Sequence, residues 1–292
     1  MKWLSLDDYL AQQGLGSLHE RVRRETLNLA GESLAVDLFH VSNTAPTVLF
    51  IHGIAVYPKI YWPFLERLRA LGYNAVAPAR QGHGDSTGRR GDCTMAEAVA
   101  TVRATLAWAS ARYTGPMFLM GSSQGGMITI AALADGVQVR AAACHNAYHP
   151  DLLPLLYQRI FFLLGRPLLK LLPQNLYLDI RRIIDFSRVT DDPDLYRLVA
   201  EEPTVAWRYT LRALTSIVTY HPSRPYSEIQ VPTLFIVGER DNMLPPEYML
   251  QVFRQLQCEK NFVLVPNAGH LLPLEYPEPF LAAVHAWFQK HL

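Results

Sequence analysis

The sequence predicts an α/β fold in which a mainly parallel central sheet carries helices on both faces. Short apolar runs recur along the chain, helical patterns separate most of them, and one long stretch contains helical patterns alone. Strands that alternate with helices favour a parallel sheet, because each crossover must return the chain to the same edge. The 292 residues are enough for one such unit with an insertion.

The predicted strands begin with an antiparallel pair. His19 to Leu29 and Ser33 to His40 flank a turn at Gly31-Glu32, and apolar and polar residues alternate in the second segment. Six continuous apolar runs follow, as expected for strands buried on both faces. These are Thr47 to Ile51, Asn74 to Ala77, Met117 to Met120, Val139 to Ala143, Thr233 to Val237 and Phe262 to Val265.

The clearest helix runs from Thr94 to Tyr113, where Thr94 and Glu97 form a capping-box pattern, and a last helix is expected from Pro277 to Lys290. Residues 147–225 show helical patterns at Leu152 to Leu172 and at Asp194 to Val218, with no clear strand. We therefore expect a core of residues 1–146 and 226–292, with a helical cap at 147–225. Large insertions of this kind usually cover a functional site.

Composition excludes several classes of protein. Half of the residues are hydrophobic, 18% are charged and the formal net charge is +1, so neither disorder nor a nucleic-acid partner is expected. The three cysteines are scattered, which argues against a disulfide framework or a zinc site.

Asp7 and Asp8 interrupt the apolar start of the chain, and Arg159, Pro167 and Lys170 interrupt its longest apolar stretch. Neither a signal peptide nor a membrane span is predicted, and we expect a cytoplasmic protein.

The pentapeptide Gly121-Ser122-Ser123-Gln124-Gly125 matches the pattern G-x-S-x-G. The pattern alone is weak, since a glycine-rich turn with an incidental serine would also produce it. Its setting is informative, because a predicted strand precedes it and an apolar helical segment, Gly126 to Leu133, follows. A sharp turn between strand and helix would expose the Ser123 hydroxyl at the edge of the sheet. We therefore predict that Ser123 is a nucleophile.

A serine hydroxyl needs a base, and the base needs a carboxylate to orient it. His270 follows the last predicted strand and precedes the last helix, which makes it the candidate base. Asp241 follows the strand Thr233 to Val237 and is the candidate acid, with Glu239 as the local alternative.

The negative charge formed during attack on an ester requires preorganised donors. One is expected from the backbone N–H of Gln124, directly after the nucleophile. The second is assigned to the N–H of Ile54, in the loop after the strand Thr47 to Ile51. Gly53 would allow close approach of that backbone, and His52 is expected to brace the loop rather than to act as a base.

At this point the sequence resembles the α/β-hydrolase superfamily, and within it the monoacylglycerol lipase and lysophospholipase-like esterases. The resemblance rests on motifs spread over residues 47–270: His52-Gly53, the segment Gln81 to Gly88, the Ser123 turn, Gly238 to Asp241, and Gly269-His270. It implies an α/β-hydrolase fold and a serine esterase that needs no cofactor or metal. An acyl-enzyme would form on Ser123 and be released by water.

Two departures from the family pattern are visible. Ala79 and Gln81 stand where relatives often have an Asp and an Arg. Ile54 and Ala55 replace a second glycine of the oxyanion loop, which narrows the space beside the acyl carbon.

The cap offers the only indication of substrate. Its Leu- and Phe-rich part, Leu152 to Leu164, either packs on the core or lines an acyl-chain pocket and contacts lipid surfaces. In the second case, polar replacements of Phe161 and Phe162 would reduce activity on long-chain esters more than on acetates. The expected substrate is a small, apolar ester. The same three residues would also suit an amide, a thioester or the C–C bond of a diketone, and the fold includes non-catalytic ligand-binding proteins.

Overall fold

A computed structural model of the chain describes residues 5–149, 152, 171–182, 184–186 and 189–292. Its centre is an eight-stranded sheet. From β4 to β10 neighbouring strands run parallel, whereas β2 is antiparallel to both of its neighbours. The strand order is β1 (Arg23–Leu29), β2 (Glu32–Phe39), β4 (Asn74–Pro78), β3 (Thr47–Ile51), β5 (Met117–Ser122), β6 (Ala141–His145), β9 (Thr233–Gly238) and β10 (Lys260–Val265). This confirms the predicted α/β fold class.

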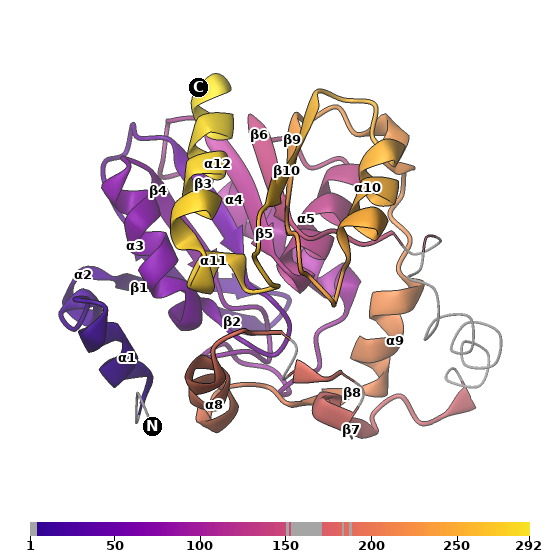
Figure 1. Cartoon of the computed structure of the whole chain (residues 1–292). Helices are drawn as coiled ribbons and strands as arrows, with labels where there is room; N and C mark the ends of the chain where they lie inside the picture. Colours follow the sequence, from indigo (N-terminus) through magenta and orange to yellow (C-terminus); the bar gives the residue numbers. More distant parts are fainter. Residues whose placement is uncertain (1–4, 150–151, 153–170, 183, 187–188) are drawn as a thin grey trace.

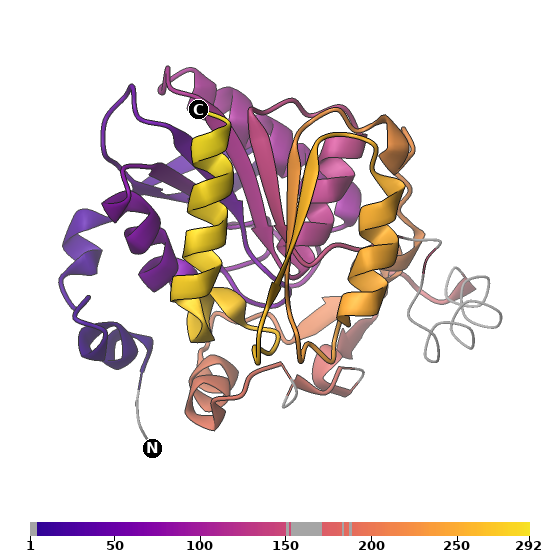
Figure 2. The ribbon, with the colours of Figure 1, turned by 45° about the horizontal axis from the view of Figure 1, so that its top comes forward.

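Helices cover both faces of the sheet, as Figures 1 and 2 show. Alternate residues of a strand point to opposite faces, so Val48 and Phe50 of β3 pack on one side and Leu49 and Ile51 on the other. The Val48 side carries α3 (Trp62–Ala70), α11 (Leu272–Glu275) and α12 (Pro277–Lys290), and the N-terminal α1 (Leu6–Gln12) and α2 (Leu18–Arg21) pack there as well. The Leu49 side carries α4 (Met95–Ser110), α5 (Gln124–Ala134) and α10 (Pro246–Gln255).

Several predicted elements match the observed ones closely. The strand β3 and the last helix α12 have the predicted bounds, and the capping box between Thr94 and Glu97 is formed. The prediction of a strand from His19 was wrong, because residues 18–21 form the short helix α2 and β1 begins at Arg23. Leu18 is fully buried against the N-terminal side of the core, a tertiary contact that the local pattern does not reveal.

Between β6 and β9, the described strands β7 and β8 and the helix α8 lie at one end of the sheet, at the bottom of Figure 1. The described elements there are β7 (Tyr177–Asp179), the 3-10 helix η3 (Ile180–Arg182), α8 (Pro193–Glu201), β8 (Arg208–Thr210), α9 (Leu211–Thr219) and the 3-10 helix η5 (Tyr226–Glu228). The expectation of no strand was wrong, since β7 and β8 form an antiparallel pair with Leu178 opposite Tyr209.

The predicted helical pattern from Asp194 to Val218 is confirmed at both of its ends, by α8 and α9, and wrong between them, because α8 ends at Glu201, just before Pro203, and β8 follows. The apolar stretch from Leu152 to Leu172 lies outside the described residues, apart from Leu152 itself and residues 171 and 172. No helix in the described ranges is both long and apolar enough to cross a membrane.

Candidate active site

Ser123 occupies a strained turn between β5 and α5. Its backbone has φ 55° and ψ −120°, a region that residues with a Cβ rarely adopt. The turn is held by the Ser123 N–H, which donates to the His145 carbonyl at 2.8 Å. The flanking glycines are required by close backbone contacts, because a Cβ on Gly121 would lie 2.0 Å from the Gly125 oxygen. A Cβ on Gly125 would lie 1.9 Å from the Ile51 oxygen. The G-x-S-x-G pattern therefore has a steric cause here.

The structure brings Ser123, His270 and Asp241 into one hydrogen-bonded chain. His270 follows β10, and its Nε2 lies 3.0 Å from Ser123 Oγ. Its Nδ1 lies 2.8 Å from Asp241 Oδ2, in the loop after β9. A carboxylate can only accept, so Nδ1 carries the proton and Nε2 is left to accept from the serine hydroxyl. Glu239, the alternative acid, is exposed and accepts from the Asn267 N–H instead.

The carboxylate of Asp241 is almost completely buried. Burial raises its pKa, but the charge of His270 and hydrogen bonds from His270 and the Leu244 N–H act in the opposite sense, and the pKa falls to about 2. Its Oδ1 accepts from the N–H groups of Met243 and Leu244 at 2.8 and 2.9 Å. Asp241 is therefore fixed as an anion against the imidazole.

Asn146 contacts both Asp241 and His270, and the sequence reasoning missed it. It follows β6 with φ 66°, and its Nδ2 lies 3.2 Å from Asp241 Oδ2 and 3.1 Å from His270 Nδ1. The amide thus donates to Oδ2 of the carboxylate, while the loop N–H groups donate to Oδ1. No local pattern marks this residue, apart from its position at the end of a predicted strand.

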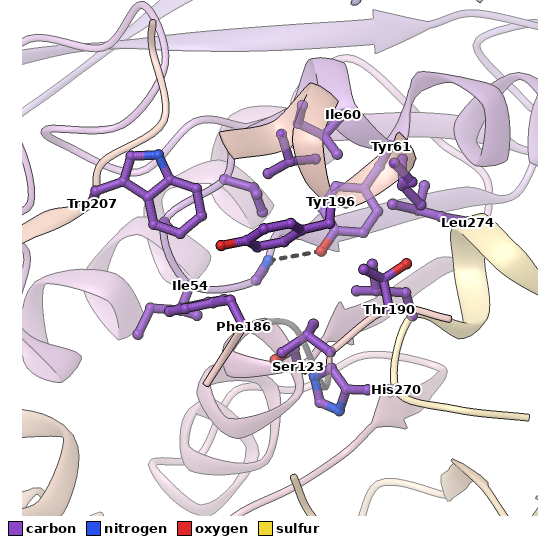
Figure 3. A pocket seen from close by; sticks show the side chains of 17 residues that line it. Ile54, Ile60, Tyr61, Ser123, Phe186, Thr190, Tyr196, Trp207, His270 and Leu274 are labelled. Atoms are coloured by element: carbon purple, nitrogen blue, oxygen red, sulfur yellow. Dashed lines mark hydrogen bonds between the residues drawn. The ribbon is translucent and has the colours of Figure 1, made fainter. Parts of the chain in front are cut away.

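The two predicted oxyanion donors have open N–H groups. Neither the Ile54 nor the Gln124 amide donates to another residue in the described part of the chain. The loop of Ile54 lies against the nucleophile, since a Cβ on Gly53 would be 3.4 Å from the Cβ of Ser123. The Gly53 N–H donates to the Tyr61 hydroxyl at 3.3 Å, a bond drawn in Figure 3.

The loop after β3 is supported from two directions. The buried His52 lies beneath it, and burial together with the charge of Arg80 holds the pKa of His52 well below its ordinary value. From the segment between β6 and β9, the hydroxyl of Tyr209 accepts from the Ala55 N–H at 2.9 Å. Ala206 N–H donates to the Ala55 carbonyl at 2.9 Å. Sequence reasoning predicted His52 as a brace of this loop and did not single out Arg80 or Tyr209.

A largely apolar cavity adjoins Ser123 and His270 (Figure 3). Its aromatic side comes from Phe186, Tyr196 and Trp207, which the sequence analysis did not single out. The remaining described lining residues are Gly53, Ile54, Ala55, Val56, Ile60, Tyr61, Val189, Thr190, Leu195, Val199, Leu271 and Leu274. No Asp or Glu is among these described lining residues, and none of the residues with described positions forms a His, Cys, Asp and Glu cluster suited to a metal ion.

Several solved structures share the fold of this chain. Monoacylglycerol lipase from Paleococcus ferrophilus superposes with a TM-score of 0.70 at 21% identity, covering 93% of this chain and 99% of that one. A soluble variant of monoglyceride lipase from Saccharomyces cerevisiae gives 0.75 at 17%, covering 93% and 97%. A thermophilic esterase from Thermogutta terrifontis gives 0.64 at 21%, covering 92% and 100%. At these identities the likeness establishes the shared fold alone.

The sequence itself matches the family described as "Serine aminopeptidase, S33" over residues 42–277. That range contains every candidate site residue, the six parallel strands of the sheet and the described residues that line the cavity, whereas β1 and β2 precede it. The chain therefore belongs to the S33 serine aminopeptidase family of α/β hydrolases.

Proposed function

We propose that this α/β hydrolase is a serine esterase that cleaves apolar carboxylic esters through an acyl-enzyme on Ser123. The observation that carries the proposal is the position of His270, which lies within hydrogen-bond distance of both Ser123 Oγ and Asp241 Oδ2. The open N–H groups of Ile54 and Gln124 are the proposed oxyanion donors, with His52 and Gly53 as the structural part of the loop.

In the proposed first step, Ser123 Oγ attacks the ester carbon and His270 Nε2 takes the hydroxyl proton. The carbonyl electron pair moves to oxygen, where the two backbone N–H groups would stabilise the negative charge. Collapse of this intermediate breaks the bond to the alcohol, which receives the proton from His270. Water then repeats the sequence on the acyl-enzyme and releases the acid.

The lining of the cavity supports an apolar acyl group of medium or long chain, of the monoacylglycerol or lysophospholipid type. Burial of such a chain against aromatic and aliphatic side chains is favourable in proportion to the area removed from water. We further propose that residues 147–225 form the cap over this cavity and that the protein acts in the cytoplasm.

An amide substrate is the second candidate, because the matched family is named for an aminopeptidase. An aminopeptidase must bind the ammonium group of a peptide N-terminus, which calls for a carboxylate near the serine. The described lining of the cavity offers none, which favours the ester. A thioester, the C–C bond of a diketone, and a binding role without catalysis remain alternatives within the fold.

The test combines a fluorophosphonate probe with p-nitrophenyl esters from acetate to palmitate, one peptide anilide and one diketone. We expect labelling and ester turnover by the wild type and by Ser122→Ala, and neither by Ser123→Ala. Ser122 is the matched control, since its buried hydroxyl contacts His145 Nδ1 at 2.9 Å rather than His270. Anilide cleavage faster than ester cleavage would favour the amide, and an unlabelled wild type would favour a binding role.

We also propose transient contact with lipid surfaces through residues 171–178. Leu171 is 82% exposed, and Leu172, Leu176 and Leu178 are exposed on the same short segment. Co-sedimentation with phosphatidylcholine vesicles tests this proposal. Loss of binding in Leu171→Ser is the expected result, and a wild type that stays in the supernatant would contradict it.

A further inference from the structure

Arg80 has the largest fully buried side chain in the described part of the molecule, with 1% of its surface exposed. It follows β4, and no carboxylate of a described residue lies within ion-pair distance of it. A buried charge without a counter-ion is costly to the fold, so such a group is normally retained for a reason.

The guanidinium contacts the loop that holds the proposed oxyanion donor. Arg80 Nη2 donates to the Gly53 carbonyl at 2.8 Å, and the Arg80 backbone N–H donates to His52 Nε2 at 3.1 Å. Because Nε2 of His52 accepts, its proton must be on Nδ1, which lies 3.0 Å from the same Gly53 carbonyl. This carbonyl therefore accepts two hydrogen bonds, one of them from a full positive charge.

The Gly53 carbonyl and the Ile54 N–H are the two ends of one planar, trans peptide unit. A donor fixed at the oxygen therefore fixes the direction of the N–H. A cation at the oxygen also draws electron density toward that end and makes the N–H a stronger donor, as in other hydrogen-bond chains in a low dielectric. We propose that Arg80 is a positioning residue that orients and polarises the Ile54 N–H toward the oxyanion.

No described group in contact with Arg80 carries a compensating charge in the resting protein. Burial, with the charge of Arg80 as the next cause, lowers the pKa of His83 to about 3, and burial likewise lowers the pKa of His52. Both imidazoles are thus neutral at pH 7. The first anion to form beside this peptide would be the oxyanion itself, so the stabilisation would arise during the reaction rather than in the ground state.

The inference rests on the proposed esterase function, and its test separates the two. Arg80→Met and Arg80→Gln remove the charge, and Arg80→Lys keeps it without the planar fork. Arg90→Met is the matched control, because Arg90 also donates to a glycine carbonyl, that of Gly84 at 3.0 Å, but outside the oxyanion loop. Near-ultraviolet circular dichroism and thermal melting identify the variants that fold.

Two ligands separate a catalytic effect from a structural one. Ser123 Oγ adds to the carbonyl carbon of an alkyl trifluoromethyl ketone and gives a tetrahedral oxyanion. The matching trifluoromethyl alcohol binds without forming a covalent bond. We expect Arg80→Met to lower kcat for p-nitrophenyl butyrate by about 10- to 100-fold. This decrease should not exceed the decrease in kcat caused by loss of one direct oxyanion donor, because Arg80 acts through the Ile54 N–H. The KM and the affinity for the alcohol should change less than about threefold, while ketone affinity falls in parallel with kcat.

Arg80→Lys should recover part of the loss, and Arg90→Met should resemble the wild type. If neither neutral variant folds, the test uses Arg80→Lys, for which the ratio of ketone affinity to alcohol affinity is measured. A ratio equal to that of the wild type would overturn the inference. So would a folded neutral variant that retains wild-type kcat, or one that loses affinity for ketone and alcohol equally. A wild type that neither turns over the ester nor binds the ketone covalently would instead overturn the proposed function.

Discussion

Buried histidines, His83 and His145 among them, make the stability of this protein sensitive to mild acid. His83 and His145 are fully buried, and burial lowers the pKa of each from 6.5 to about 3. The charge of Arg80 adds to the effect at His83, and the charge of His270 adds to it at His145. In the unfolded chain both imidazoles would titrate near the ordinary value.

The sign of the effect follows from these two pKa values. Below pH 6.5 the unfolded chain takes up protons that the folded protein cannot bind until about pH 3. Stability present above pH 6.5 is therefore lost as the pH falls through this window. At pH 5 the loss is about 2 kcal/mol for each histidine, or about 4 kcal/mol for both. A domain is typically stable by only about 5–15 kcal/mol, so the loss is large.

The assay is urea unfolding at pH 8 and pH 5, followed by circular dichroism. The difference in unfolding free energy between the two pH values should shrink by about 2 kcal/mol in His83→Gln and in His145→Gln. Any effect of the substitution common to both pH values cancels in this difference. His40→Gln is the control, since His40 is exposed. An unchanged difference in His83→Gln would refute the claim that the fold holds this imidazole neutral.

Two further predictions concern groups around the site. Tyr209→Phe removes the acceptor of the Ala55 N–H and leaves a buried amide unpaired. Urea unfolding should show a loss of about 1–3 kcal/mol in the free energy of unfolding. An unchanged free energy would mean that water replaces the hydroxyl. Asn146→Ala removes a donor from Asp241, and we expect kcat for p-nitrophenyl butyrate to fall about tenfold with little change in KM. A change in KM alone would show that Asn146 acts on substrate binding instead.

The parts of the fold that were predictable are those whose signal is local. β3 is buried on both faces and therefore reads as an unbroken apolar run, and the start of α4 carries its capping box in four residues. The short pair of β7 and β8 lacks such a signal, because three-residue strands are too short to show a period. Their pairing depends on residues about thirty positions apart, which local patterns do not reveal.

The same distinction applies to the candidate site. Ser123, Asp241 and His270 each follow a predicted strand, so their meeting at one edge of a parallel sheet was predictable from order and position alone. Their catalytic roles remain a proposal. Tyr209 lies 154 residues from Ala55, and Asn146 lies 95 residues from Asp241, so only the folded chain reveals these contacts. The aromatic wall from Phe186, Tyr196 and Trp207 was missed for the same reason.

The central claim is that ester cleavage passes through an acyl-enzyme on Ser123. Rapid mixing with p-nitrophenyl butyrate, an acid quench and mass spectrometry of the intact and the digested protein test it most directly. The account predicts a burst of p-nitrophenolate equimolar with enzyme and a butyryl group on Ser123, both lost in Ser123→Ala. A butyryl group on another residue, or full turnover by Ser123→Ala, would contradict it.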